Sequence, residues 1–459
     1  MERNMGTLTF INHASYSIET KKTLLLVDPW VEGTAFDNGW ALLDKSILNK
    51  QLVDYVVNVD KKTYIWLSHE HSDHFSVPFL KSLKQTNNLD VTFIFQKTLD
   101  GRVANFIRKL GFQVIESNDQ LEILDSELSL VTFPYSGGDS YCLTILNDFT
   151  ILNINDCVIS NWSEADYVKK TYLKYTSNID LLMTQFGYAN WVGNITEKNL
   201  RVASAKEKLD RIVLQAVKFQ PTTVIPFASF VYFSHPENFY MNDSQNSPLD
   251  VQDVFVKQKL KSELVVLKPW DTLELDQGLS LQKDSQLAIE HWIKCLDEIQ
   301  PHPDVKIKYS LNEIKVEEQL YRKKIFRSFL TAPKLMEAVG ILKPLKVYLT
   351  DLDQNLTLSY RRSLSDLVAN RSDCDIALSS STLMFILRNE YGANTTLVNG
   401  KFQKISKNGH EVFTRYFVPQ EYMKMGYGLN HPFSTAKIIY GKLKNKLLGR
   451  LTVINPSLE

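Results

Sequence analysis

The sequence predicts an α/β layered domain followed by an α+β accessory domain. In the first half of the chain, short apolar runs alternate with stretches of helical spacing, a pattern typical of layered α/β domains. Beyond residue 279 the sequence becomes more charged and mainly helical. Because a chain of 459 residues exceeds the usual size of one hydrophobic core, we expect a boundary near residue 280. The expected domains are residues 1–279 and residues 280–459.

Each expected element rests on its apolar pattern and on the residues that interrupt it. The expected strands of the first domain are residues 7–11, 16–19, 23–27, 64–67, 91–95, 128–133, 141–146, 149–154 and 223–226. Its expected helices are residues 77–84, 99–110 and 200–219. In the second domain we expect helices at 287–299 and 381–390, a mostly helical stretch at 311–340, and a hairpin of 345–350 with 356–360.

Composition and charge exclude several classes of protein. Lys and Arg together number 52, as do Asp and Glu, so no net positive field favours a nucleic-acid partner. No run approaches the roughly 18–20 apolar residues of a membrane span, and residues 1–10 lack the apolar core of a signal peptide. The four cysteines, at positions 142, 157, 295 and 374, form no Cys-x-x-Cys pair. We therefore expect a cytoplasmic protein with reduced thiols, no nucleic-acid partner and no integral membrane segment.

A dense group of metal-binding side chains follows the strand expected at residues 64–67. His69, His71, Asp73 and His74 form the pattern His-x-His-x-Asp-His. Residues two apart in extended chain point the same way, so His69 and His71 can converge on one cation. After a turn, Asp73 and His74 can face a second cation beside the first. Because imidazole and carboxylate ligands suit zinc, iron or manganese, the motif predicts a site for one or two divalent metal ions, zinc or iron.

A supporting carboxylate is expected at the end of the third strand. Asp28 lies in Val27-Asp28-Pro29-Trp30 and can accept a hydrogen bond from a ligand imidazole, which would fix the tautomer of that ring. The alternative is a turn that ends the strand before Pro29, and the sequence favours neither.

The run from His69 to His74 resembles the signature of the metallo-β-lactamase superfamily, and the chain resembles more narrowly the catalytic region of the CMP-N-acetylneuraminate hydroxylase family. The matching segments are Asn12-His13-Ala14-Ser15, Val27-Asp28-Pro29-Trp30, Ile151-Leu152-Asn153 through Asp156-Cys157, Pro226-Phe227-Ala228 and Ser234-His235-Pro236. The resemblance spans most of residues 7–275 and returns near 375–405. It implies an αββα sandwich with metals at its rim, and the accessory domain is loosely similar to a sterol-carrier fold.

The resemblance also extends the expected set of site residues. It implies that Asp156 bridges two metals and that His235 is the last histidine ligand, although a turn residue and a loop histidine are the plain alternatives. It places His13 beside the metals or the substrate. Tyr188 and Asn190 lie where the family's substrate loop would be, and aromatic packing is an equal alternative for this segment.

Two departures from the family pattern bear on the chemistry. The family has a histidine just before the position of Asp139, where this chain reads Pro134-Tyr135-Ser136-Gly137-Gly138. Either Asp139 coordinates in its place, or one metal has a weaker set of ligands, or only one metal is held tightly. The hydroxylases also carry a Rieske iron–sulfur domain, and this sequence has no Cys-x-His or Cys-x-x-His pair. Oxygenase chemistry would therefore draw electrons from a separate donor.

Three functions remain open from the sequence. The favoured one is a hydrolase that uses a metal-bound hydroxide on a small polar metabolite, with Asp73 as the catalytic residue that orients the hydroxide. The second is a diiron oxygenase with a small substrate of nucleotide-sugar type and an external electron donor. The third is a degenerate metal-binding homologue without catalysis, for which the missing histidine near Asp139 is the argument.

Overall fold

The computed structural model describes the chain except residues 1–5, 87–89, 276–283, 304–306, 365–369 and 448–459. The chain divides into two compact units. The first comprises Met1–Ala189, Asn199–Ser234 and Met241–Gln300, and the second comprises Asn190–Lys198, His235–Tyr240 and Pro301–Glu459. Two short segments that precede residue 241 therefore belong to the second unit.

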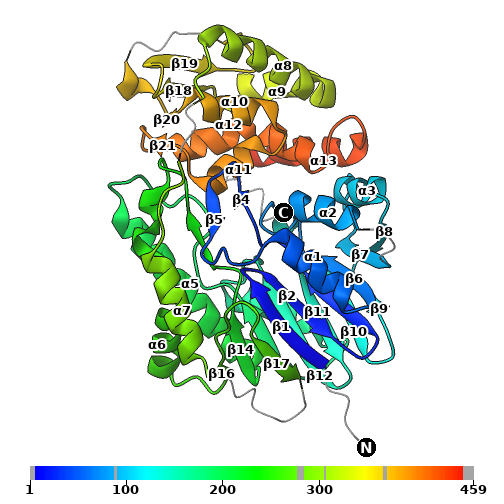
Figure 1. Ribbon diagram of the computed structural model, residues 1–459. Helices are drawn as coiled ribbons and strands as arrows, with labels where there is room; N and C mark the ends of the chain where they lie inside the picture. Colours follow the sequence, from blue (N-terminus) through cyan, green and yellow to red (C-terminus); the bar gives the residue numbers. More distant parts are fainter. Residues whose placement is uncertain (1–5, 87–89, 276–283, 304–306, 365–369, 448–459) are drawn as a thin grey trace, which may run out of the picture. The chain divides into compact units, whose positions relative to one another are not determined.

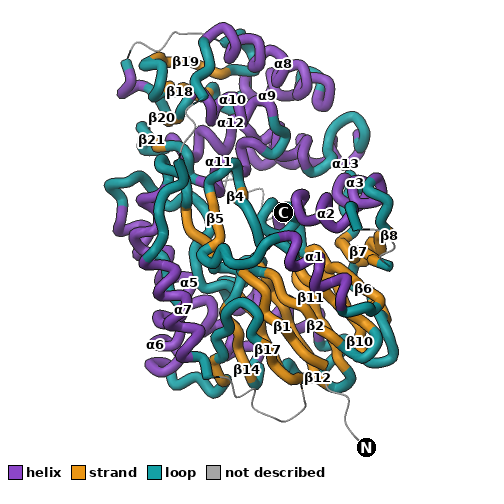
Figure 2. The backbone as a smooth tube through the Cα atoms, in the orientation of Figure 1, coloured by secondary structure: helices purple, strands orange, loops and turns teal. Residues whose placement is uncertain are grey.

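Two seven-stranded sheets form the body of the first unit (Figure 2). The first sheet has the order β17-β1-β2-β3-β6-β7-β8, and the second has the order β16-β14-β13-β12-β11-β10-β9. The strands of the first sheet are β1 (Gly6–Asn12), β2 (Ser15–Glu19), β3 (Thr23–Val27), β6 (Lys62–Leu67), β7 (Val91–Gln96), β8 (Gln113–Ser117) and β17 (Thr272–Leu275). Those of the second are β9 (Leu121–Ile123), β10 (Leu128–Pro134), β11 (Ser140–Leu146), β12 (Phe149–Asn155), β13 (Leu181–Thr184), β14 (Thr223–Pro226) and β16 (Glu263–Leu264).

Buried hydrogen bonds join the inner faces of these two sheets. The indole nitrogen of Trp66 on β6 donates to Thr132 Oγ1 on β10 at 2.9 Å. Asn153 Nδ2 on β12 donates to the hydroxyl of Tyr16 on β2 at 3.2 Å. All four side chains are buried, so these bonds satisfy polar groups that the sandwich withdraws from water. They also fix how the two sheets align.

Helices cover the outer faces of the sandwich. α1 (Asn49–Asn58), α2 (Val77–Lys84) and α3 (Arg102–Lys109) cover the first sheet (Figure 1). Leu52, Phe79 and Ile107 on these helices share one core with Phe93 and Ile65 of the sheet. α4 (Trp162–Tyr172) and α5 (Lys198–Phe219) pack on the second sheet. The Tyr141 hydroxyl on β11 lies 2.6 Å from Thr171 Oγ1 on α4, and Thr184 Oγ1 on β13 donates to Gln215 Oε1 on α5. The arrangement is an αββα sandwich, as the sequence predicts.

The remaining elements of the first unit extend the sandwich. They are a small sheet of β15 (Val231–Phe233), β5 (Trp40–Leu42) and β4 (Thr34–Ala35), the 3₁₀ helices η1 (Ser136–Gly138) and η2 (Phe239–Ser244, shared with the second unit), and helices α6 (Pro248–Gln258) and α7 (Gln286–Asp297). Trp292 on α7 is fully buried, stacks on Phe230 with a centroid distance of 3.9 Å, and donates its indole N–H to the Leu267 carbonyl. These contacts assign α7 to the first unit.

The second unit is an α+β assembly with its own core. Its sheet has the order β19-β18-β20-β21, with β18 (Leu345–Leu349), β19 (Gln354–Leu358), β20 (Ile376–Leu378) and β21 (Gln403–Lys404). Its helices are α8 (Leu311–Phe329), α9 (Ala332–Ala338), α10 (Ser380–Arg388), α11 (Gly392–Asn399), α12 (Gly409–Lys424) and α13 (Pro432–Leu447), with the 3₁₀ helix η3 (Arg371–Asp373). Phe329, Met336 and Ile438 help to line an apolar pocket within this unit.

The two segments Asn190–Lys198 and His235–Tyr240 are anchored within the second unit. Trp191 stacks on Phe402 and on the ring of His410, with centroid distances of 4.8 and 5.2 Å. Asn238 Nδ2 donates to the Asn399 carbonyl at 2.6 Å. The expected boundary near residue 280 lies in residues 276–283, outside the described residues, and the contacts instead divide the chain at Gln300 and Pro301. Among the described residues, no helix is long and apolar enough to cross a membrane.

Candidate metal centre

The candidate site lies where parallel strands of both sheets end. β3, β6 and β7 pair in parallel in the first sheet, and β12, β13 and β14 do so in the second. Asp28, Ser68, Asp156 and Gln185 each stand directly after one of these strands, and Gln96 ends another. Because the carboxyl ends of parallel strands share an edge, the topology collects these polar side chains on one rim.

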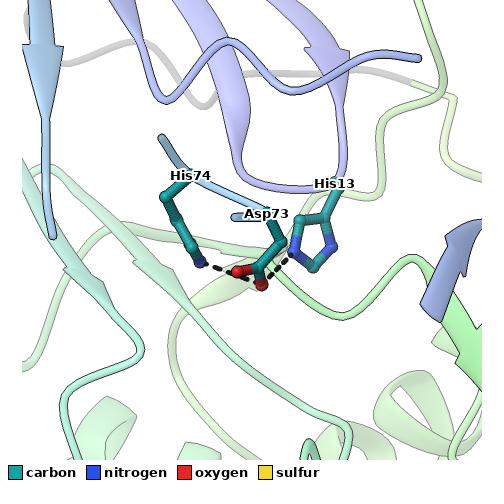
Figure 3. Close-up of side chains that lie close together, drawn as sticks. All are labelled: His13, Asp73 and His74. Atoms are coloured by element: carbon teal, nitrogen blue, oxygen red, sulfur yellow. Dashed lines mark ion pairs between the residues drawn. The ribbon is translucent and has the colours of Figure 1, made fainter. Parts of the chain in front are cut away.

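Six side chains on this rim form two groups of three metal-donor atoms. The first donor group is His69, His71 and Asp156, and the second is His13, Asp73 and His74. Within each group, the donor atoms all lie within 4.8 Å of one another. Figure 3 shows His13 and His74 directed at the carboxylate of Asp73 from opposite sides, at 3.5 and 3.3 Å from its Oδ2.

Asp156 connects the two groups. Its Oδ2 lies 3.4 Å from His74 Nε2 and 3.9 Å from His69 Nε2. Its other oxygen accepts a hydrogen bond from Gln185 Nε2 at 2.6 Å, so the carboxylate is held with Oδ2 toward both histidines. In the first group, His69 Nε2 and His71 Nδ1 are 2.9 Å apart. This geometry suits a carboxylate shared by two neighbouring cations.

Asp139 lies at the edge of the first donor group. It follows the Gly137-Gly138 turn of η1, and its Oδ1 is 3.9 Å from His69 Nε2. Gln96 Nε2 donates to the carbonyls of both Gly138 and Ser68, which ties this turn to the loop that carries His69. An oxygen donor therefore stands near the place where the family has a histidine.

Buried hydrogen bonds fix the orientation of the histidines. Asp28 is fully buried and accepts a hydrogen bond from His74 Nδ1 at 3.0 Å. Ser68 Oγ donates its one proton to Asp28 Oδ2 and therefore accepts from His69 Nδ1 at 2.9 Å. Both rings then carry a proton on Nδ1 and direct Nε2 at the centre. Ligand histidines in metal sites are held by such carboxylate and hydroxyl partners.

Electrostatics at the centre favour a bound cation. Burial opposes ionisation of Asp73 and Asp156, but the neighbouring His74 outweighs it and holds the pKa of both carboxyls below the usual value. Burial opposes the charged form of His74, yet Asp73, Asp156 and Asp28 hold its pKa well above 6.5. Burial, reinforced by His74 and His71, lowers the pKa of His69. The ionised carboxylates of Asp73 and Asp156 thus stabilise the extra proton on His74, and a bound metal ion would replace that proton and neutralise them.

The donor set fits a divalent metal. Within the described part of the chain, both ring nitrogens of His13, Oδ1 of Asp73 and Nε2 of His74 are buried without a hydrogen-bond partner. Buried polar atoms without partners are costly, and a cation would satisfy all three side chains. His13 and Asp28 also have positive φ angles, of 41° and 39°. Such conformations cost energy and tend to persist where a site requires them.

The other expected residues are not members of these two groups. Tyr188 is buried, stacks on Phe233, and donates its hydroxyl to the Met241 carbonyl. His235 belongs to the second unit, as does the exposed Asn190. His235 begins the segment in which Asn238 Oδ1 accepts its backbone N–H at 3.0 Å. Its role as a ligand stays a prediction.

Replacing Asp28 tests the hydrogen bonds that orient the histidines. Asp28→Asn keeps the size of the side chain but removes the negative charge of the carboxylate that accepts the hydrogen bond from His74 Nδ1. We expect zinc affinity, measured by titration against a competing chelator, to fall by roughly 10–100-fold. Asp54→Asn, on the exposed side of α1, is the matched control and should bind zinc like the wild type. Unchanged zinc affinity in Asp28→Asn would show that Asp28 does not orient the ligand histidines.

Lys208 is a buried cation that the sequence analysis missed. It lies on the inner face of α5, and burial, with Arg211, lowers its pKa to about 8, while Glu207 and Asp156 act in the opposite direction. The unfolded chain therefore binds more protons than the native one between pH 8 and about 10.5, so this group makes stability rise with pH across that window.

Lys208→Met should stabilise the protein by roughly 3 kcal/mol at pH 7, because it removes the buried charge while keeping the side-chain length. The gain should shrink as the pH rises from 8 toward 10. Denaturant unfolding at several pH values measures the difference, and Lys206→Met, on the exposed face of the same helix, is the control. A gain that does not change with pH would mean that Lys208 is not the group responsible.

Comparison with known proteins supports the fold of this unit. Residues 7–186 match the family model described as a beta-lactamase superfamily domain. The chain is 26% identical over 302 residues to the cytidine monophosphate-N-acetylneuraminic acid hydroxylase of Danio rerio, an alignment that covers 62% of this chain and 48% of that protein. The chain thus spans about half the length of the curated relatives that it matches.

Solved structures with a similar arrangement include both hydrolases and hydroxylases. A metallo hydrolase from Ignicoccus hospitalis is 15% identical with a TM-score of 0.40, and the match covers 59% of this chain and 99% of that one. A diiron β-hydroxylase from Streptomyces venezuelae is also 15% identical with a TM-score of 0.40, covering 59% of this chain and 54% of that one. By the match to the family model and by its sheet topology, the first unit of this chain is a domain of the metallo-β-lactamase fold.

Proposed function

We propose that the chain is a metal-dependent hydrolase that acts on a small polar metabolite at the rim of its first unit. The observation that carries the proposal is the position of Asp156 Oδ2 between His69 Nε2 and His74 Nε2, at 3.9 and 3.4 Å. One carboxylate can then serve both donor groups, as a site for two neighbouring cations requires.

The residues of the centre have distinct roles in such a reaction. Bound divalent cations would lower the pKa of a coordinated water and polarise a substrate oxygen. Asp73 is held ionised by His74 and His13, so its carboxylate can accept a hydrogen bond from the attacking water and orient it. Asp28 accepts a hydrogen bond from His74 Nδ1, which fixes the tautomer of that ring and keeps its Nε2 directed at the centre.

Aromatic rings flank the two donor groups and limit access of bulk water. The ring of Trp30 meets His13 edge-on at 5.6 Å, and Phe36 meets His71 at 5.5 Å. Trp30 and Phe36 are both buried. A dry, low-dielectric wall strengthens every charge interaction at the centre, including those that would stabilise negative charge on the substrate.

Oxygenation is the second candidate, and the similarity to hydroxylases over 62% of the chain favours it. The same imidazoles and carboxylates suit iron as well as zinc. Hydrolysis is preferred because it consumes only the substrate and water. An oxygenase would also need two electrons per turnover from a separate donor. The substrate to try first is the cytidine monophosphate-N-acetylneuraminic acid of its relatives.

Removing two ligands tests whether the centre is the site of catalysis. His69→Ala and His71→Ala should each lose the metal of the first donor group and roughly 10²-fold or more in activity, because that group then has two members. Elemental analysis of protein purified without added metal, with a panel of ester, amide, thioester and phosphodiester substrates, provides the measurement. His431→Ala, in the second unit, should behave as the wild type. Full metal content and activity in both variants would refute the assignment.

The same samples separate the two reactions. Zinc or manganese in the purified protein, with turnover that consumes no dioxygen, supports the hydrolase. Two irons, with dioxygen uptake when the nucleotide sugar and a reductant are added, would replace the hydrolase with the oxygenase.

A further inference from the structure

A second cluster of metal-binding side chains, which shares no residue with the two donor groups, lies in the first unit. It comprises Asp44, which follows β5, and His291 and Cys295 on α7. The three donor atoms lie within 4.8 Å of one another, with His291 Nε2 2.8 Å from Asp44 Oδ2 and 3.7 Å from Cys295 Sγ. His291 and Cys295 are four residues apart, so they share one face of the helix.

Hydrogen bonds to one oxygen of the Asp44 carboxylate orient the other. Its Oδ1 accepts from the backbone N–H and the hydroxyl of Ser46, at 2.7 and 2.5 Å. Asn12 Nδ2 donates to the Asp44 carbonyl at 2.9 Å and fixes the backbone. Oδ2 is thereby directed at His291. Metal-binding carboxylates are oriented by hydrogen bonds of this kind to the second oxygen.

The helix that supplies the other two donors is equally fixed. Trp292 stands beside His291 on α7, and its fully buried ring stacks on Phe230. Its indole N–H donates to the Leu267 carbonyl at 2.8 Å. The position of α7 against the segment that carries Asp44 is therefore set by core packing, independently of the three polar side chains.

We propose that Asp44, His291 and Cys295 form a zinc site, with water as the fourth ligand. One carboxylate, one imidazole and one thiolate are ligands that zinc takes in tetrahedral sites, and calcium and magnesium do not take sulfur. Tetrahedral zinc places nitrogen and oxygen donors about 3.4 Å apart, so the His291–Asp44 pair opens by roughly half an ångström when the ion replaces its hydrogen bond. The ion joins α7 to the end of β5.

Binding is coupled to the loss of one proton. Cys295 Sγ–H releases its proton to solvent as the sulfur–zinc bond forms, and the neutral imidazole of His291 donates its Nε2 lone pair. Burial, together with the charges of Asp44 and Glu298, raises the pKa of the Cys295 thiol to about 11. A bound divalent ion would neutralise Asp44 and stabilise the thiolate, and affinity increases with pH because binding displaces a proton.

Cobalt(II) provides the test, because a cobalt–thiolate bond gives a near-ultraviolet charge-transfer band that nitrogen and oxygen ligands do not. The full chain at pH 8, titrated with Co²⁺, should develop this band, and one equivalent of Zn²⁺ should remove it. The band should persist in a His69→Ala, His71→Ala double variant, which isolates it from the first donor group. It should be absent from Cys295→Ser, and His291→Gln should weaken cobalt binding at least tenfold.

Two further variants control for two of the other three thiols. Cys157→Ser, next to Asp156, and Cys374→Ser, in the second unit, should both retain the band. A wild-type protein without the band, or a band that survives in Cys295→Ser, would overturn the proposal. Either result leaves the hydrolase assignment untouched, because that assignment is measured by metal content and turnover at His69 and His71.

Discussion

The buried carboxylate of Asp28 is the interaction on which the candidate centre depends. It accepts four hydrogen bonds, from the backbone N–H and hydroxyl of Ser68, from His74 Nδ1 and from Asn155 Nδ2. Through Ser68 it also orients His69. Charge-assisted hydrogen bonds in a buried setting are strong, and the unfavourable φ of Asp28 is tolerated in return. One side chain thus sets the tautomers of a histidine in each donor group.

Asp28 also shows how the fold converts two sheets into one site. Ser68 follows β6 of the first sheet, whereas Asn155 ends β12 of the second, and both donate to the same carboxylate. The cross-sheet bond of Trp66 to Thr132 fixes the alignment deeper in the sandwich. The rim is therefore rigid before any ion binds, and an ion meets donors that are already in place, which reduces the cost of ordering them.

Much of the fold and part of the centre follow from local sequence pattern. The β-strands of the sandwich core, such as Thr23–Val27 and Phe149–Asn155, are apolar runs with clear breaks. The His-x-His-x-Asp-His motif predicts four metal donors from its sequence alone. The role of Asp156 as a ligand could be predicted only from the family resemblance, because a single Asp after a strand more often ends a turn than binds a metal. The structure brings all five into the two donor groups. The supporting roles of Gln96 and Gln185 have a weaker signal, their position at or just after a strand of a parallel sheet.

What the sequence did not reveal depends on contacts between distant segments. His13 was expected only beside the site, yet a left-handed turn between β1 and β2 places its ring within the second donor group. Nothing in the residues around Asn190 or His235 indicates that they pack with Phe402 and Asn399, more than 150 positions later; those contacts assign both segments to the second unit. Long-range packing of this kind has no local pattern to read.

The most direct test of the central claim is anomalous scattering from crystals grown with zinc or manganese. We expect two peaks at this centre, about 3.5–4 Å apart, one bound by His69 and His71 and the other by Asp73 and His74, with Asp156 between them. Well-ordered side chains with no anomalous peak at either group, in crystals grown with excess metal, would contradict it.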